Sequence, residues 1–245
     1  GHAVEGANAV INLVGILKGD FDAVHGQGAS NAAEAAKAAG VETLVQVSAI
    51  GADAESPSAY GRSKAEGEAA VRKAFPTATI LRPSIIFGRE DQFINRFAGL
   101  IRMLPIVPVI GGATKFQPVF VGDVARAVAA IVEDPQSHAS KTYELGGPEI
   151  MTMTQVNRWI AEATGRDRPM LEILDEVSGP LATLTGWLPG APITRDQWLM
   201  LQSDNVVGAK AMGLAALGIA PTPLDAVTPG WLVQYRKHGR FGATA

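Results

Sequence analysis

The sequence contains no cysteine, few aromatic residues and little charge, and each shortage excludes a class of protein. Without cysteine, its 245 residues can form no disulfide scaffold, thiolate metal site or cysteine nucleophile. The 21 Lys and Arg residues are outnumbered by 24 Asp and Glu residues, and the net charge of -3 leaves no basic stripe for a phosphate backbone. We therefore expect no nucleic acid among the partners.

Long apolar runs and clustered metal ligands are missing as well. A membrane-spanning helix needs about 18 consecutive apolar residues, whereas the most apolar segment, 9–17, is interrupted by Asn12 and Gly15. No transmembrane segment is predicted, and attachment to a membrane surface remains an open alternative. The spacing of the histidines predicts no metal site. They stand at His2, His25, His138 and His238.

Strand and helix patterns alternate through the first part of the chain. Nearly continuous apolar runs at 9–17, 43–49 and 78–87 are typical of strands buried on both faces of a parallel sheet. The segments 21–39 and 58–75 lie between these runs and have helical patterns. This order indicates an α/β fold with right-handed parallel crossovers.

The alternation weakens after Gly88. We expect helices at 91–104 and 122–133, an extended segment at 117–121 and a strand at 141–145. Beyond Pro148 the pattern becomes mainly helical, at 154–164, 176–187 and 194–202. We therefore predict one domain over 1–148 and a smaller, mainly helical region over 149–245.

The strongest local motif is the pair Tyr60 and Lys64, at the start of a predicted helix. A spacing of four places both side chains on one helix face. A phenol with an ordinary pKa near 10 can transfer a proton at neutral pH only if a neighbouring cation stabilises the phenolate, and Lys64 is placed to supply it. The pair follows a buried strand that ends near Ser48, at the sheet edge where open α/β sheets bind ligands.

Taken in order, these pieces resemble the extended and atypical short-chain dehydrogenases, and within them the nucleotide-binding accessory subunit of respiratory complex I and its bacterial relatives. The segments FGRED (87–91) and ITRD (193–196) are the most specific part of this resemblance, whereas the Tyr60/Lys64 pair identifies only the superfamily. The other segments that carry it are Asn12–Gly15, Val47–Ala49, Phe75–Pro76, Arg82–Ser84, Ile85–Ile86, Phe93, Asn95, Phe97, Gln117–Val119, Val121, Asp123–Val124, Leu217–Ile219 and Thr222–Leu224.

The resemblance implies a Rossmann-type, doubly wound sheet that binds NADP(H) or NAD(H), followed by a smaller helical region. Ser48, Tyr60 and Lys64 would be the catalytic residues if the protein is an enzyme. The implied cofactor contacts are Leu13, Val14, Gly15, Ser48, Tyr60, Lys64, Pro83, Ser84 and Ile85.

Two departures from the family pattern limit how far the family's cofactor site and catalytic residues can be assigned to this sequence. Family members begin with a strand and a glycine-rich turn that holds the cofactor pyrophosphate, and this sequence starts at Gly1 without them. At about 30 residues per crossover unit, we expect roughly 60 to 80 residues to be missing, and dinucleotide binding by these residues alone to be poor. Active members also place a Ser or Thr hydroxyl at the end of the strand that corresponds to 43–49 here. Matching the segment Val47–Ala49 to that pattern puts Ala49, rather than Ser48, at the hydroxyl position.

If Ala49 holds that position, Tyr60 and Lys64 bind the nicotinamide ribose instead of driving turnover. The leading hypothesis is then a non-catalytic or weakly catalytic accessory or assembly subunit of complex I. Its place would be the bacterial cytoplasm at the inner face of the cytoplasmic membrane, or the matrix side in mitochondria. Two alternatives stay open: an NAD(P)-dependent oxidoreductase or epimerase that uses Tyr60 and Lys64, and an NADP-sensing regulator.

Overall fold

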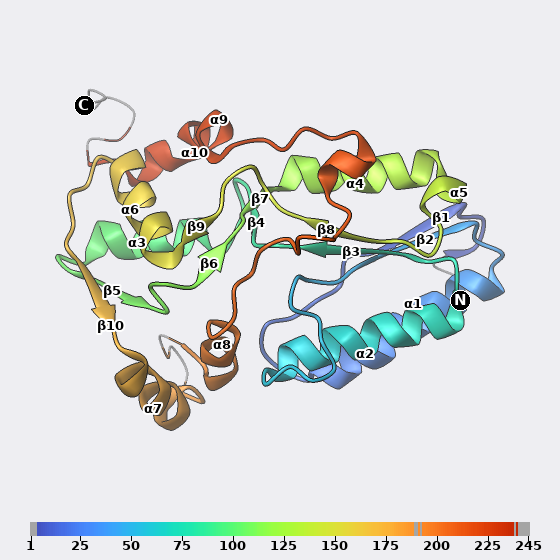
Figure 1. Ribbon diagram of the computed structural model, residues 1–245, viewed down its shortest axis with the longest axis horizontal. Helices are drawn as coiled ribbons and strands as arrows, with labels where there is room; N and C mark the ends of the chain where they lie inside the picture. The colour runs from blue at the N-terminus through green and yellow to red at the C-terminus, as the bar shows by residue number, and fades with distance from the viewer. Residues whose placement is uncertain (1–3, 189–190, 192, 238, 240–245) are drawn as a thin grey trace. The chain divides into compact units, whose positions relative to one another are not determined.

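The apolar runs of the first part form a four-stranded parallel sheet in the computed structural model, which describes residues 4–188, 191, 193–237 and 239. Its neighbouring strands are paired so that Ile11 lies opposite Val45, and Val47 opposite Leu81. Because all four strands are parallel, their carboxyl ends meet at one edge of the sheet (Figure 1). The strand order is β1 (Ala9–Asn12), β2 (Thr43–Val47), β3 (Thr79–Pro83) and β8 (Thr142–Leu145).

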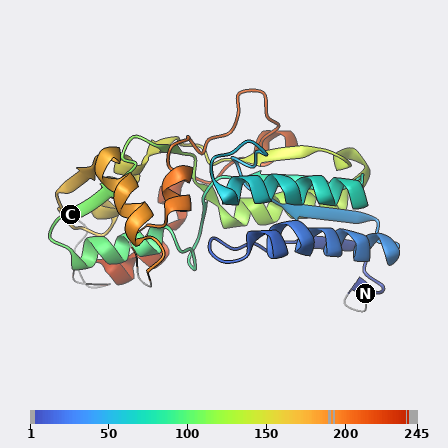
Figure 2. The ribbon, with the colours of Figure 1, turned by 90° about the horizontal axis from the view of Figure 1, so that it is seen from below.

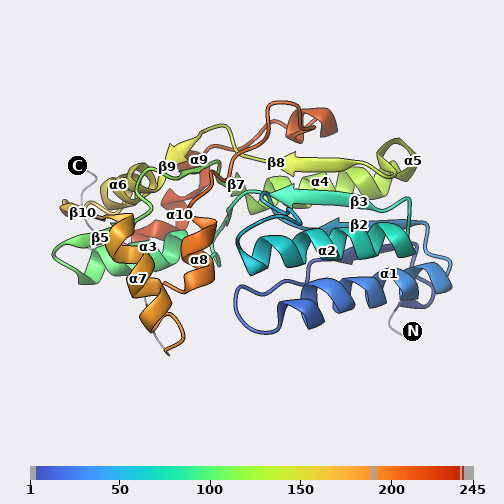
Figure 3. The ribbon, with the colours of Figure 1, turned by 60° about the horizontal axis from the view of Figure 1, so that its bottom comes forward.

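Helices cover both faces of this sheet, as expected for a doubly wound fold. A π-helix, η2 (Asp22–Gln27), continues directly into α1 (Gly28–Ala38), and α1 lies beside α2 (Ala59–Ala74) on one face (Figure 2). The opposite face is covered by α4 (Val121–Glu133) (Figure 3). Leu44 and Ile80 belong to the buried core against α1 and α2. The predicted Rossmann-type parallel sheet is therefore confirmed.

The first strand differs from its prediction as a run buried on both faces. β1 ends at Asn12, and Leu13 in the loop that follows is 67% exposed. Among the described residues β1 pairs only with β2, so the apolar side chain of Ile11 stays 39% exposed. The apolar composition that suggested a central strand here belongs partly to a surface loop.

The second core is built on α3 (Ile94–Met103) and α6 (Met153–Ala163), which pack together through Ala98, Ile101 and Ile160. Predicted helices correspond to α3, α6, α7 (Asp175–Thr185) and α8 (Arg195–Met200). Of the short strands around them, β4 (Ile86–Phe87) lies in the predicted run 78–87 and β7 (Val119–Phe120) in the predicted extended segment 117–121, whereas the other four were not predicted. Pro108 lies inside one of these strands, and proline weakens a strand pattern. The strand pairs are β4 (Ile86–Phe87) with β7 (Val119–Phe120), β5 (Val107–Ile110) with β10 (Met170–Ile173), and β6 (Lys115–Phe116) with β9 (Met151–Thr152).

The remaining elements are short helices. They are α5 (Pro135–His138), α7 (Asp175–Thr185), α8 (Arg195–Met200), η3 (Leu214–Leu217), α9 (Leu224–Val227), α10 (Pro229–Leu232) and η4 (Val233–Tyr235).

Two compact units, each discontinuous in sequence, divide the chain. The first contains 1–84, 122–146 and 207–221, and the second contains 85–121, 147–206 and 222–245. In the first unit the returning segment joins the edge strand β8, because the backbone N–H of Glu144 donates to Met212 O at 2.9 Å. This division differs from the single boundary predicted near residue 148.

Candidate functional site

Tyr60 and Lys64 lie on the first turns of α2, beside the carboxyl edge of the sheet. The helix begins at Ser58, whose hydroxyl caps it by accepting from the backbone N–H of Gly61 at 3.3 Å. Lys64 Nζ donates to Val47 O at the end of β2 over 3.2 Å. The same Nζ lies 6.0 Å from the centroid of the Tyr60 ring. The structure thus brings the two predicted residues together at the predicted edge.

The electrostatics of the pair differ from the prediction that Lys64 would favour a phenolate. Burial raises the pKa of Tyr60 to about 12. Burial also lowers the pKa of Lys64, although the nearby Glu68 opposes that change. With a pKa this high, Tyr60 is a neutral phenol at pH 7 and can donate a hydrogen bond, but it is not poised as a base.

A buried ion pair holds the helix that carries these residues. Arg82 on β3 donates to Glu68 twice, from Nε and from Nη2, each over 2.8 Å. Its Nη1 lies 3.6 Å from Glu144 Oε1 on β8. Both carboxylates raise the pKa of Arg82, chiefly through the Glu68 hydrogen bonds. Because Glu68 is one turn beyond Lys64, this network fixes α2 and places a compensating negative charge near the buried ammonium.

Ser48 follows β2 directly and is 5% exposed. Its backbone N–H donates to Leu81 O at 2.7 Å, so it extends the ladder between β2 and β3. Its hydroxyl Oγ is buried without a hydrogen-bond partner among the described residues. A buried hydroxyl left in this way can bind a ligand group that reaches it. Ala49, the next residue, offers no such group.

The predicted cofactor contacts are only partly assembled. Leu13 and Val14 have side chains that are 67% and 61% exposed, in the loop after β1. Pro83 ends β3, and Ser84 N donates to Leu145 O at 2.8 Å, so both lie at the same carboxyl edge as Ser48. Ile85 belongs to the second unit instead and packs against its cluster of Val109, Phe116 and Met153.

Gly15 lies at the surface over the buried lysine. A β-carbon placed on Gly15 would be 3.5 Å from Lys64 Nζ and 3.6 Å from His25 Nε2. The loop after β1 therefore passes close to the polar centre of the site, and the backbone N–H of Ile16 donates to His25 Nε2 at 3.0 Å.

His25 belongs to this site and was missed by the sequence analysis, which treated the histidines as scattered. Its side chain is buried in η2, stacked on Phe21 at 5.5 Å and set edge-to-face against Tyr60 at 5.5 Å. Burial and the nearby Lys64 lower the pKa of His25 to about 4. The four-residue spacing of Phe21 and His25 placed both rings on one helix face, but nothing in the sequence showed that this face meets Tyr60.

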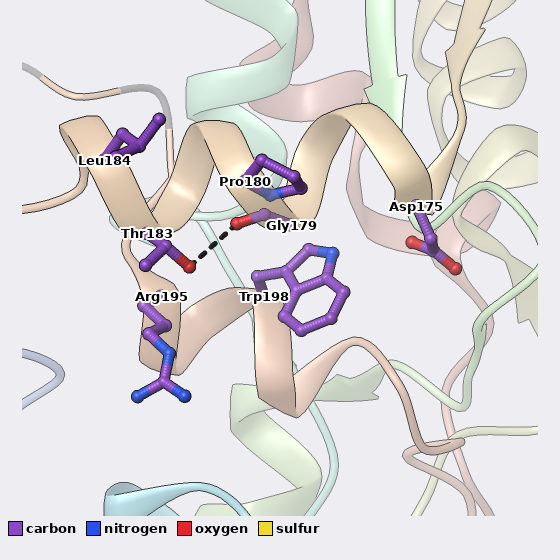
Figure 4. Close-up of a pocket in the computed structure, with 7 residues that line it drawn as sticks. All are labelled: Asp175, Gly179, Pro180, Thr183, Leu184, Arg195 and Trp198. Carbon is purple, nitrogen blue, oxygen red and sulfur yellow. Dashed lines mark hydrogen bonds between the residues drawn. The ribbon is translucent and has the colours of Figure 1, made fainter.

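A separate hollow of about 460 Å³ lies in the second unit, between α7 and α8 (Figure 4). Arg195 and Trp198 line one side and Gly179 and Thr183 the other, and Thr183 Oγ1 donates to Gly179 O at 2.9 Å. The lining holds only two ionisable groups, Asp175 and Arg195. The described part of the chain contains no cluster of potential metal ligands, and none of its helices has the length and hydropathy to cross a membrane.

The sequence is similar to subunits of mitochondrial NADH dehydrogenase. It is 36% identical over 263 residues to NADH dehydrogenase (ubiquinone) 1 alpha subcomplex subunit 9 of Arabidopsis thaliana, covering 97% of this chain and 63% of that protein. The Mus musculus protein of the same name is 36% identical over 230 residues, covering 91% and 60%. The chain thus spans about three fifths of the length of these relatives.

Solved structures share the fold at lower identity. The NADP(H) complex of a Citrobacter sp. triphenylmethane reductase has a TM-score of 0.73 at 19% identity, covering 94% of this chain and 78% of that one. DesIV, a dTDP-glucose 4,6-dehydratase from Streptomyces venezuelae with NAD and TYD bound, has a TM-score of 0.71 at 17% identity, covering 97% and 76%.

The family model described as the RmlD substrate binding domain matches residues 20–182, which is more than half of the chain. That range includes the π-helix with His25, the Tyr60/Lys64 pair and the end of β3. The resemblance to the short-chain dehydrogenases is thereby confirmed, and the chain belongs to the RmlD substrate binding domain family.

Proposed function

We propose that this protein binds NADP(H) or NAD(H) and serves as an accessory or assembly subunit of respiratory complex I. The observation that carries the proposal is the 36% identity to a mitochondrial NADH dehydrogenase subunit along 97% of the chain. Tyr60 is suited to donate a hydrogen bond to a bound ligand, because burial raises its pKa to about 12 and keeps the phenol neutral.

Dinucleotide binding is supported by the polar groups gathered at the carboxyl edge of the sheet, where open α/β sheets hold their ligands. Lys64 supplies a cation and Ser48 a buried hydroxyl without a partner among the described residues. The test is a fluorescence titration of the protein with NADPH and NADH. Saturable binding that Lys64→Met weakens at least tenfold is expected. No binding of either dinucleotide contradicts the proposal.

The assembly role places the protein with complex I subunits, at the inner face of a bacterial membrane or on the matrix side in mitochondria. An exposed apolar face on α7 is a suitable contact surface. Leu174, Val177 and Leu184 are 67%, 58% and 72% exposed and recur at helical spacing. Trp187 nearby is 74% exposed, and its Nε1 donates to Leu184 O at 2.9 Å.

Affinity purification of the protein tests this role. Complex I subunits are expected in the purified material, and Leu184→Glu is expected to reduce them without changing dinucleotide affinity. Lys37→Glu, on the exposed side of α1, is the matched surface control and is expected to leave recovery unchanged. Recovery of the protein only as a free monomer rules out the assembly role.

The alternative is an NAD(P)-dependent oxidoreductase or epimerase, and the RmlD family match favours it. Tyr60 would then be the general acid, with Lys64 and Ser48 holding the substrate hydroxyl or carbonyl. This alternative predicts substrate-dependent NADPH oxidation that Tyr60→Phe abolishes while NADPH still binds. A third reading, an NADP-sensing regulator, predicts a protein partner whose binding depends on whether NADPH or NADP is bound.

A further inference from the structure

In the π-helix η2, the backbone of His25 packs against Gly67 of α2 and its ring contacts Tyr60. π-Helices are rare and are often found at functional sites. Here the backbone carbonyl of His25 packs directly on α2, since a β-carbon at Gly67 would lie only 2.3 Å from His25 O. The glycine at position 67 therefore lets η2 and α2 approach closely enough for the His25 ring to reach the first turns of α2.

The hydrogen bonds of the ring define its tautomer. The backbone N–H of Ile16 can only donate, and it lies 3.0 Å from His25 Nε2, which must accept. In a neutral ring the proton then resides on Nδ1, which lies 2.8 Å from Ser63 Oγ. Ser63 Oγ in turn donates to Tyr60 O at 2.8 Å. One chain of hydrogen bonds thus runs from the loop after β1 to the first turn of α2.

The loop held in this way lies over Lys64. Gly15 precedes the anchored Ile16, and its backbone approaches both Lys64 Nζ and His25 Nε2. The rest of the loop has little packing of its own, because Leu13, Val14 and Leu17 are all more than half exposed. The Ile16–His25 hydrogen bond therefore ties this loop to the aromatic and polar centre of the site.

We propose that His25 is a positioning residue that clamps the loop of residues 13–17 over Lys64 and so controls access to the lysine. For ligand binding, this inference rests on the proposed function, since Leu13, Val14 and Gly15 are predicted dinucleotide contacts. In that setting His25 fixes the loop and the Tyr60/Lys64 pair in one arrangement before the dinucleotide arrives.

The first test is the tautomer of His25 in the unmodified protein. Long-range ¹H–¹⁵N correlation at pH 7 is expected to show a neutral ring protonated on Nδ1, with Nε2 as the acceptor. A ring protonated on Nε2 overturns the proposal, because such a ring cannot accept from Ile16 N–H.

The second test compares His25→Phe with His25→Gln. Phenylalanine keeps the stacking on Phe21 but cannot accept a hydrogen bond, whereas glutamine offers an acceptor. In His25→Phe, exchange of the Ile16 amide hydrogen and reductive methylation of Lys64 are each expected to rise at least tenfold. His25→Gln is expected to restore most of the protection, and methylation of the exposed Lys37 is the internal reference. Unchanged rates in His25→Phe overturn the proposal.

Ser63→Ala provides a variant for the case in which His25→Phe fails to fold. It removes the partner of Nδ1 but leaves the ring, and a two- to fivefold faster exchange of the Ile16 amide is expected. If the exchange rate of the Ile16 amide is unchanged in Ser63→Ala, this result contradicts the clamp. NADPH titration separates the two proposals. If the Ile16 amide exchanges slowly and His25 has the predicted tautomer but NADPH does not bind, only the proposed function is refuted. If NADPH binds but the Ile16 amide exchanges freely, only the clamp is refuted.

Discussion

At the scale of single residues, the buried His25 makes the stability of the protein depend on pH. Its pKa of about 4 in the folded state lies below the ordinary value of 6.5. As pH falls from 6.5 to 4, the unfolded chain therefore binds a proton that the folded chain does not, and the free energy of unfolding falls. This stability is fully present above pH 6.5 and is lost as the pH falls through the folded pKa, and the loss is on the order of 3 kcal/mol.

Urea unfolding at pH 7.5, 5.5 and 4.5 measures this contribution. The loss of stability toward pH 4.5 is expected to be smaller in His25→Gln than in the wild type, because glutamine does not titrate. Parallel pH profiles of the two proteins would show that His25 titrates alike in the folded and unfolded states.

Arg82 allows a second prediction at this scale. Arg82→Met leaves Glu68, whose side chain is 7% exposed, without its bidentate partner, and we expect a loss of about 3 to 5 kcal/mol. Arg82→Lys is expected to recover little, because an ammonium cannot form the paired hydrogen bonds. Chemical denaturation checks both variants, with the exposed Lys37→Met as a control that should change stability by less than about 0.5 kcal/mol. A loss below 1 kcal/mol in Arg82→Met would contradict the prediction.

The two most family-specific segments, FGRED and ITRD, fix the starts of helices in the second unit. In FGRED, Asp91 Oδ1 accepts from the backbone N–H groups of Phe93 and Ile94 at 2.8 and 2.6 Å and so fixes the start of α3. In ITRD, Thr194 forms a capping box with Gln197 at the start of α8. Both segments are recognisable in the sequence. That Asp91 and Thr194 bind backbone N–H groups at the starts of α3 and α8 is shown only by the structure, because it depends on where those helices begin.

At the scale of elements, the close approach of η2 and α2 depends on a residue with no side chain. Gly67→Ala would place a methyl group 2.3 Å from a backbone carbonyl oxygen, which cannot move without displacing η2. We expect a loss of more than 2 kcal/mol in unfolding free energy and faster exchange of the Ile16 amide. Gly26→Ala, within η2 itself, meets no atom within 4 Å and is expected to be neutral or slightly stabilising. Equal stability of the two variants would show that the helices have room to separate.

The helices and central strands were predictable because their periodicity reflects local burial, as in α2 and β2. The π-helical geometry of η2 was not, since its residues also fit an ordinary helix pattern. Ser48 shows the same limit at the site: the sequence placed it at the sheet edge but could not show that its hydroxyl is buried without a partner among the described residues. Contacts between segments far apart in sequence decide such details.

At the scale of the whole molecule, the first unit is completed by a segment from the far end of the chain. Within 207–221, Gly208 N donates to Glu144 Oε2 at 2.8 Å, and Met212 forms a parallel bridge with Tyr143. A fragment of residues 1–148 retains all four strands of the main sheet but loses these contacts. We expect it to unfold at a temperature at least 5 °C below that of the 245-residue chain.

Calorimetry of the 1–148 fragment, alone and mixed with a peptide of residues 205–222, measures this dependence. Partial recovery of the transition temperature with the peptide is expected, and a scrambled peptide is the control. A fragment as stable as the 245-residue chain would show that residues 207–221 contribute nothing to this unit.

The returning segment also sets an order of events during synthesis. A nascent chain emerges from the ribosome from its N-terminus, and residues 1–146 appear well before 207–221. Until about residue 221 has left the exit tunnel, Glu144 and the outer edge of β8 lack the hydrogen-bond partners that residues 207–221 supply. A nascent chain in that interval presents an unpaired strand edge, a state in which aggregation and chaperone binding compete with folding.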